Sequence, residues 1–255
     1  MDPAPAIGIG LGFVVIGGAN MLEGGNPMSM FLLPPLLLVF GATIMITIAG
    51  GTMADAKGAA VSFKRAFTSN AASADDLVPE VVALADRARR EGLLSLEESV
   101  RSLDDEFLRR GVTMAIDGTD PEELREILES EVHAKRKADK HAAKFWSDAG
   151  AYAPTIGIVG TVMGLVHVLE NLAEPEKLGH LIAAAFLATF WGVCSANVIF
   201  LPLGNRLKRL GELEAARMEV AIEGIAAIQA GSNSRVVAQK LRSMLPGRAP
   251  AQEAA

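Results

Sequence analysis

Residues 149–169 read AGAYAPTIGIVGTVMGLVHVL, and residues 181–205 read LIAAAFLATFWGVCSANVIFLPLGN. Neither stretch contains Asp, Glu, Lys or Arg, and each exceeds the roughly 18 residues that a helix needs to cross a bilayer. The connection between them is short and carries charge, including Lys177. The two stretches therefore predict a membrane hairpin.

Small residues and hydroxyl groups recur along one side of each predicted span. Gly157, Thr161 and Gly164 are spaced by four and three residues, and Thr189 and Gly192 repeat this spacing in the second stretch. One interpretation is helix packing, in which a threonine bonds the carbonyl four residues before it. The other is that the hydroxyl oxygens line a path for a cation. The glycines assigned to packing are Gly157, Gly160, Gly164 and Gly192.

The two uncharged stretches of the hairpin contain no carboxylate that could take up and release a cation. His167 lies near the outer end, off the stripe that holds Thr161, so we expect an interfacial, non-functional role for it. Cys194 is the single cysteine, which excludes an intrachain disulfide and favours simple packing. A polar path without a carboxylate indicates that the titrating residue belongs to a partner, as in an ion-driven complex.

Two further uncharged stretches, residues 3–22 and 24–54, are also long enough to span a bilayer. Of the 24 Lys and Arg residues, 15 lie in 51–148 and 8 lie in 205–255. By the positive-inside rule these two regions are cytoplasmic, and four spans then place both termini inside. The sequence predicts an all-α membrane protein with four transmembrane helices, a helical cytoplasmic domain between spans two and three, and a C-terminal cytoplasmic helix. The predicted ranges are a transmembrane hairpin at 1–54, a cytoplasmic domain at 55–148, the ion-path hairpin at 149–205, and an amphipathic helix with a tail at 206–255.

Helix signals within the charged regions give finer expectations. A helix at 57–67 continues from span two, and Ser95 caps a helix that runs to residue 108. The Asp120-Pro121 pair begins a helix that continues into span three. Residues 206–245 form one long helix with Gly224 and Gly231 as its weak points.

Composition and motifs exclude several classes of function. Region 51–148 mixes 15 basic with 20 acidic residues, which argues against a nucleic-acid partner. The chain has no phosphate-binding loop, no G-x-S-x-G motif and no metal-spaced His and Cys residues. We therefore expect no enzymatic activity, no catalytic residue, no metal site and no cofactor other than a transported cation.

Two sets of residues have both a simple and a functional interpretation. Pro154 and Pro202 flank the hairpin, and each is either a tolerated kink or a hinge. Arg89, Arg90 and Glu97 belong to a charge cluster around residue 92, for which the simple interpretation is a solvated, salt-bridged face.

The stretch APTIGIVGTVMGLVHVLENLAEPEKLGHLIAAAFLATFWGVCSANVIFLPLGNRLK, residues 153–208, resembles the A subunit of bacterial flagellar motor stators, the MotA/PomA group. This group belongs to the MotA/TolQ/ExbB proton channel superfamily. Residues 85–98, ADRARREGLLSLEE, and the four-span layout add to the resemblance.

The resemblance implies a homopentamer around a dimer of a single-span MotB/PomB-type B subunit, whose intramembrane Asp takes up the ion. It also implies a multi-pass protein of the bacterial inner membrane that exerts torque on the rotor protein FliG and so drives flagellar rotation and chemotaxis. Carried over by position, the rotor contacts are Arg89, Arg90 and Glu97, the functional prolines are Pro154 and Pro202, and the ion-path hydroxyls are Thr161 and Thr189.

The resemblance leaves the transported ion open. Thr161 is similar to the sodium-type members, because several proton-type members have Ala there, whereas Ala188 lacks the second hydroxyl that some sodium-type members carry. Sodium is preferred over the proton on this basis. The alternative function is an ExbB/TolQ-like motor that energises an envelope system, although those relatives typically have three spans. A non-conducting membrane scaffold would explain the packing stripes but not the charge motif.

Overall fold

The computed structural model describes residues 2–69 and 73–245, and every regular element among them is helical. The chain divides into two compact units. The first unit comprises the described residues of 1–70 and 139–209, and the second comprises those of 71–138 and 210–255. This division differs from the four predicted ranges, because residues 55–69 and 139–148 belong to the first unit. The last ten residues of the predicted tail, 246–255, lie outside the described residues.

The first unit begins with an uninterrupted helix and then a broken one. Helix α1 spans Ala4–Leu22 and is followed by a 3₁₀ turn, η1, at Pro27–Met30. The broken helix consists of α2 (Leu33–Leu36), a π-helical segment η2 (Leu37–Ala42) and α3 (Thr43–Ala49). The prolines at 34 and 35 stand in its first turn, where their missing N–H groups cost no helical hydrogen bond.

Three helices among the described residues are long and apolar enough to cross a membrane. They are Ala4–Leu22, Pro121–Glu170 and Pro175–Gln229. The predicted second span corresponds to Leu33–Ala49, an apolar helix shorter than 18 residues. The prediction of an all-helical membrane protein is confirmed, and the fourth crossing stays a prediction.

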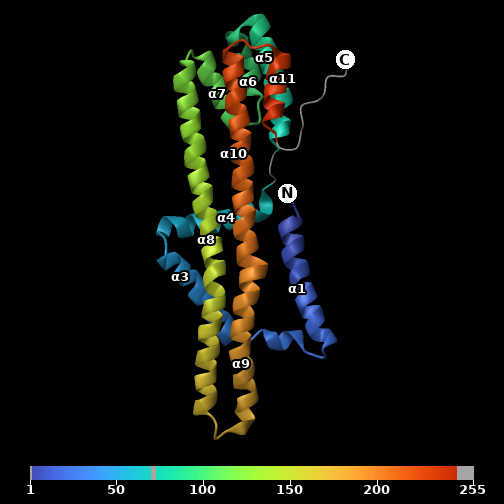
Figure 1. The fold of residues 1–255 in the computed structure, drawn as a ribbon, viewed down its shortest axis with the longest axis vertical. Helices are drawn as coiled ribbons and strands as arrows, with labels where there is room; N and C mark the ends of the chain where they lie inside the picture. The colour runs from blue at the N-terminus through green and yellow to red at the C-terminus, as the bar shows by residue number, and fades with distance from the viewer. Residues whose placement is uncertain (1, 70–72, 246–255) are drawn as a thin grey trace. The chain divides into compact units, whose positions relative to one another are not determined.

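Helix α8, Pro121–Glu170, joins the charged part of the chain to the third predicted span (Figure 1). Its first turn is capped by Asp120, whose Oδ1 accepts hydrogen bonds from the backbone N–H groups of Glu122 at 2.9 Å and Glu123 at 3.4 Å. The helix continues through Pro154 without a break. The prediction that one helix enters span three from residue 121 is therefore confirmed.

The fourth predicted span continues directly into the C-terminal region. Helix α9 (Pro175–Cys194), a π-helical segment η5 (Ser195–Phe200) and α10 (Leu201–Gln229) follow one another without a gap. Gly231 has a φ of +62°, and Asn233 caps the separate helix α11, Ser234–Ser243. The expectation of a single helix over 206–245 is wrong, because a left-handed glycine ends α10.

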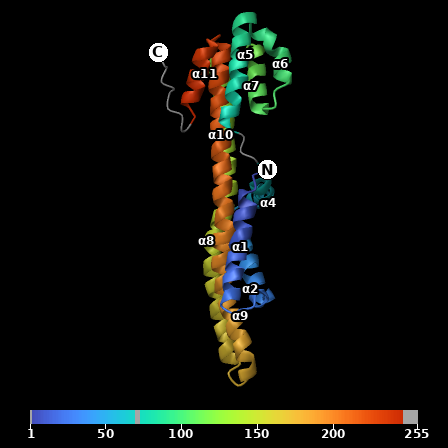
Figure 2. The ribbon, with the colours of Figure 1, turned by 90° about the vertical axis from the view of Figure 1, so that its right-hand side faces the viewer.

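Helix α4, Met53–Thr68, which is labelled in Figure 2, belongs to the first unit and is separate from α3 (Figure 1). It begins with a capping box, in which Thr52 and Asp55 each satisfy the other's backbone N–H. The predicted continuation from span two is therefore wrong. Its inner face packs on α8, where the Trp146 indole N–H donates to the Ser62 hydroxyl at 3.3 Å.

The second unit packs short helices against the charged segments of α8 and α10. These helices are η3 (Ala74–Asp76), α5 (Leu77–Glu91), η4 (Leu93–Leu96), α6 (Glu97–Arg101), α7 (Glu106–Ile116) and α11. Leucine, isoleucine and valine side chains form one buried core. They come from α5, α6, α7 and α11 and from the segments of α8 and α10 in this unit. The expected helix from Ser95 to residue 108 is wrong, because the chain breaks after Arg101 and Asp105 caps α7 by accepting from the Leu108 N–H at 2.8 Å.

Candidate functional site

The α8–α9 hairpin is packed as closely as backbone atoms allow. A Cβ on Gly157 would lie 2.8 Å from the Ala188 carbonyl oxygen, and one on Gly192 would lie 2.7 Å from the Ala153 carbonyl oxygen. A Cβ on Gly164 would lie 2.5 Å from the Ala185 Cβ. The structure thus places these predicted packing glycines in the helix contact, where a side chain has no room.

Gly160 also lies on this contact but meets a second helix as well. A Cβ there would lie 2.6 Å from the Ala188 Cβ and 2.7 Å from the Leu38 Cδ2 of η2. This glycine therefore lets the broken helix approach the hairpin.

Thr161 and Thr189 meet at the centre of the hairpin and their hydroxyl groups are hydrogen-bonded to each other. The Thr161 Oγ1 also lies 3.2 Å from the Gly157 carbonyl oxygen and 3.0 Å from the Ala185 carbonyl oxygen. The Thr189 Oγ1 lies 3.4 Å from the Gly157 carbonyl oxygen. Four oxygen atoms therefore converge at one place between the two helices.

Proton counting shows what this cluster of four oxygens can do. Two hydroxyls supply two protons, and one of these is used in the bond between Thr161 and Thr189. The other reaches a carbonyl, so the cluster has more acceptors than donors. Oxygen atoms of this kind coordinate hard cations such as sodium. Thr161 bonds its own i−4 carbonyl and also contacts the facing helix, as the packing interpretation expects, and the cation path stays a prediction.

The two predicted prolines occupy different settings. Pro154 is half-buried within the unbroken α8. Pro202 follows directly after η5, where the π-helical segment changes the hydrogen-bond register just before a residue that has no N–H. Only Pro202 therefore coincides with an irregularity of the helix. Of the other two residues considered in the spans, His167 is exposed and Cys194 is buried.

The predicted rotor contacts lie on either side of a tight turn in the second unit. Arg89 and Arg90 are exposed at the end of α5, and Glu97 is exposed at the start of α6. Gly92, with a φ of +84°, forms the turn between them. Arg90 and Glu97 each form an ion pair within their own helix. Arg90 pairs with Asp86 at 2.7 Å, and Glu97 pairs with Arg101 at 3.5 Å.

Arg89 differs from its neighbours, because it has no ion pair with any residue in 2–69 or 73–245. An exposed guanidinium without an internal partner keeps its donors available for another molecule. Among the three predicted contacts, Arg89 is the one whose charge the fold itself does not use.

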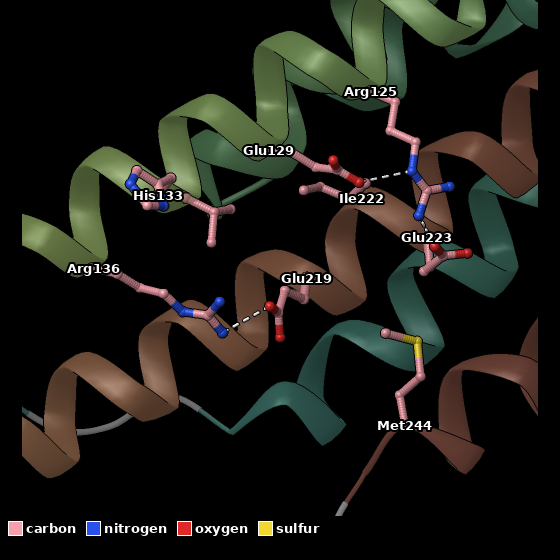
Figure 3. A pocket seen from close by; sticks show the side chains of 9 residues that line it. Arg125, Glu129, His133, Arg136, Glu219, Ile222, Glu223 and Met244 are labelled. Atoms are coloured by element: carbon pink, nitrogen blue, oxygen red, sulfur yellow. Dashed lines mark hydrogen bonds and ion pairs between the residues drawn. The ribbon is translucent and has the colours of Figure 1, made fainter.

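A charged cleft of about 400 Å³ lies within the second unit and was not expected from the sequence (Figure 3). Two of its ion pairs connect α8 with α10, and a third lies within α8. Arg125 bonds Glu129 at 2.8 Å and also Glu223, and Arg136 bonds Glu219 at 2.7 Å (Figure 3). Both of these arginines are thus already paired with carboxylates, so we interpret the cleft as a structural junction.

Glu223 is the carboxylate that joins three helices in this junction. Lys240 of α11 lies 2.5 Å from it, and Arg125 of α8 contacts it from the other side. The hydrogen bond from Lys240 lowers the pKa of Glu223 below its ordinary 4.5, burial opposes this shift, and the bond from Arg125 adds to it. The ionised form is therefore the one that the fold stabilises.

Because the pKa of Glu223 is lower in the folded than in the unfolded chain, this stabilisation is fully present above pH 4.5 and is lost as the pH falls through the folded value. We expect Glu223→Gln to lower the unfolding temperature of the purified complex by roughly 2–4 °C at neutral pH. The difference from the wild-type protein should shrink under acid conditions. Glu98→Gln, an exposed carboxylate on α6, is the matched control. A deficit that stays constant with pH would contradict the role of the charge.

Some contacts could have been found from the sequence and others could not. Asp2 and Arg206 are the charges that border the uncharged stretches 3–22 and 181–205, and they form an ion pair at 2.6 Å. Their boundary positions were a usable signal. The hydrogen bond from the Trp191 indole N–H to the Met30 carbonyl at 2.7 Å had no such signal.

Comparisons with known proteins match this architecture over nearly the whole chain. The model of the MotA/TolQ/ExbB proton channel family matches residues 99–220. Motility protein A of Bacillus subtilis is 35% identical over 97% of this chain and 92% of its own length. A structure of C. jejuni MotAB superimposes with a TM-score of 0.92 at 30% identity, covering 100% of both chains. The flagellar MotAB stator complex from Bacillus subtilis gives 0.87 at 35% identity, covering 95% of this chain and 96% of that one. With this identity over this length, and with the all-helical fold, the chain belongs to the MotA/PomA group of flagellar stator A subunits within the MotA/TolQ/ExbB proton channel family.

Proposed function

We propose that this chain forms a cation channel with a MotB-type B subunit and converts ion flow into torque on FliG. The observation that carries the proposal is the cluster of four oxygens around Thr161 and Thr189, within spans that contain no carboxylate. Such a cluster offers oxygen ligands to a cation but has no group that can bind and release a proton. A partner must bring the titrating group, for which an intramembrane Asp is the expected residue.

Uncovered apolar surface supports assembly around a partner. Of the membrane-length window of α8, 17% is buried within the chain, and none of the corresponding window of α1 is buried. Lipid, the B subunit and further copies of the chain are the surfaces that would cover it. A pentamer with four spans per chain, both termini in the cytoplasm and the inner membrane as its location fits this requirement. We expect no enzymatic step and no cofactor.

The energy source proposed is the ion gradient. One charge that crosses about 100 mV yields about 2.3 kcal/mol. Sodium is the preferred ion, because neutral hydroxyl and carbonyl oxygens are its usual ligands and Thr161 supplies one at the hairpin centre. The proton remains the second candidate, since the B subunit also sets the choice.

Identification of the partner tests this function directly. The protein is purified from its native membrane, and single-span proteins that co-purify are identified by mass spectrometry. A partner with an intramembrane Asp and a peptidoglycan-binding domain supports the stator. A partner of the ExbD or TolR type would instead show that the chain energises an envelope system. Absence of cation flux in liposomes, for the complete complex with every tested activating change in the B subunit, would favour a scaffold.

The proposed rotor contact predicts the effect of charge reversal. Arg89→Glu should abolish most of the torque while leaving complex assembly intact, because Arg89 makes no ion pair among the described residues. Tethered-cell rotation measures torque, and co-purification of the B subunit measures assembly. Lys137→Glu, an exposed basic residue of α8 in the same unit, is the control that should rotate normally. Rescue by an opposite reversal on FliG supports direct contact, and loss of assembly would show a structural role instead.

A further inference from the structure

Helix α4 runs across the long axis of α8, and the two are packed together within the first unit (Figure 1). Figure 2, turned by 90°, shows α4 nearly end-on, which agrees with this direction. Ser62 of α4 accepts the hydrogen bond from Trp146 of α8 at 3.3 Å, and Arg65 of α4 pairs with Asp139 of α8. The uncharged stretch of α8 begins at residue 149, directly after these contacts. A helix that crosses α8 at this level lies along the membrane surface.

The two flanks of α4 face opposite ways along α8. The Phe63 ring lies 5.5 Å from the Trp146 ring, measured between centroids, whereas Arg65 pairs with Asp139. Asp139 precedes Trp146 in α8, so the flank of Phe63 is turned towards the uncharged stretch and the flank of Arg65 is turned away from it. Phe67, one turn after Phe63, contacts it at 5.2 Å between ring centroids. Phe63 is nevertheless 43% exposed. The apolar flank of α4 is therefore open on the side of the hydrocarbon.

The face of α4 opposite the buried Ser62 carries two lysines within an apolar stripe. Residues at spacings of four, four and three positions form this stripe, namely Met53, Lys57, Val61 and Lys64. Val61 is 73% exposed although its side chain is apolar. Neither lysine side chain has an ion pair or a hydrogen bond with any residue that the structure describes. The stripe therefore offers two free cations beside uncovered apolar side chains.

We propose that α4 lies in the headgroup layer of the membrane and that Lys57 and Lys64 bind the phosphate groups of anionic phospholipids. Phe63 then reaches the acyl chains, and the lysine stems lie along the apolar stripe while their ammonium groups meet the phosphates. An anionic lipid supplies both the charge and the hydrocarbon that this surface requires. Free phosphate supplies only the charge. The proposal uses the predicted spans but not the ion path, so its tests do not depend on ion flux.

The depth of α4 is measured on the complete complex with its B subunit, in nanodiscs of phosphatidylcholine and phosphatidylglycerol. A spin label at Ala60→Cys, in a Cys194→Ala background, reports collisions with oxygen and with a water-soluble nickel chelate. Position 60 shares the flank of Phe63 and should be shielded from the chelate. The matched control is Gly58→Cys on the flank of Arg65, where an added Cβ meets no heavy atom within 4 Å. Its label should collide freely with the chelate.

Native mass spectrometry of the same complex, titrated with phosphatidylglycerol, tests the two lysines. Lys57→Gln combined with Lys64→Gln should weaken lipid binding roughly tenfold or more, because each lysine near the surface contributes to the attraction. Lys57→Arg combined with Lys64→Arg keeps both charges and should bind the lipid as the wild type does. The control is Lys137→Gln, an exposed lysine about 18 Å along α8 before residue 149, which is farther than the screening length of roughly 10 Å. It should leave binding unchanged.

Four results would overturn the proposal. Equal exposure of the labels at positions 58 and 60 to the chelate would show that α4 is outside the headgroup layer. Wild-type affinity in the double glutamine variant would show that the lysines do not hold the lipid. Displacement of the lipid by millimolar inorganic phosphate would identify a free-anion site. A high-yield disulfide from Val61→Cys, in a Cys194→Ala background, to a second copy of the chain would show that a protein covers the stripe.

Discussion

Replacing Gly157 with Ala is expected to force the α8–α9 hairpin apart and to abolish motility. The added Cβ would lie 2.8 Å from the Ala188 carbonyl oxygen and 3.1 Å from the Cα atoms of Thr189 and Gly192. These are backbone atoms, so no side-chain rotation relieves the overlap. Overpacking of this kind costs about 1–3 kcal/mol. Separation of the helices would also pull Thr161 away from Thr189, so stability and ion passage should fail together.

The measurement is the amount of intact complex in membranes, compared with swimming speed. Gly179→Ala in α9 is the matched control, because it adds the same methyl group where no heavy atom lies within 4 Å. We expect that variant to assemble and swim normally. A Gly157→Ala strain with normal complex levels and normal speed would show that the close contact between the helices is dispensable.

Replacing Thr161 with Ala is expected to remove sodium-driven swimming without loss of assembly. The change deletes the hydroxyl that contacts Thr189 and the carbonyls of Gly157 and Ala185, and it leaves a smaller side chain that fits the same space. Loss of about 1.4 kcal/mol of ion coordination corresponds to tenfold weaker binding. Sodium-driven swimming should therefore be lost at sodium concentrations that support the wild type, which is measured as swimming speed against sodium concentration at constant ionic strength.

Two companion variants make this result specific. Thr161→Ser retains the oxygen and should restore most of the speed. Thr155→Ala removes a hydroxyl from the same helix, one that bonds the Tyr152 carbonyl at 2.7 Å and takes no part in the cluster. It should swim normally. An unchanged sodium dependence in Thr161→Ala would refute sodium coordination at this position and leave the proton as the transported ion.

The sequence predicted the helices whose signals are local. The Asp120 cap and the long run without a breaker gave the start of α8 and its entry into the membrane. The π-helical segments η2 and η5 were not predicted, because nothing in a local pattern distinguishes a π turn from an α turn. The helix expected from Ser95 to residue 108 failed because Ser95 lies inside η4, where its hydroxyl donates to the Gly92 carbonyl, and because Asp105 caps a new helix.

The candidate site shows the same limit. The residue spacing predicted that Thr161 and Thr189 lie on the small-residue faces of their spans. It could not predict that the two residues lie opposite each other. Whether two stripes face one another depends on the rotation of each helix about its axis, and only the packed hairpin fixes that rotation. The charges near Gly92 could be located from sequence, but the absence of an ion pair of Arg89 with any described residue required the positions of Asp86 and Glu97.

By itself, the sequence determined that the chain is a helical membrane protein. It also determined the bounds of the uncharged stretches and the absence of carboxylates from them. Those properties follow from composition and from periodicity along a single helix. Only the tertiary structure decided that four oxygens from two helices converge at one point, and that Asp2 pairs with Arg206. Both are contacts between residues far apart in the chain, and their geometry is set by which helix faces pack together.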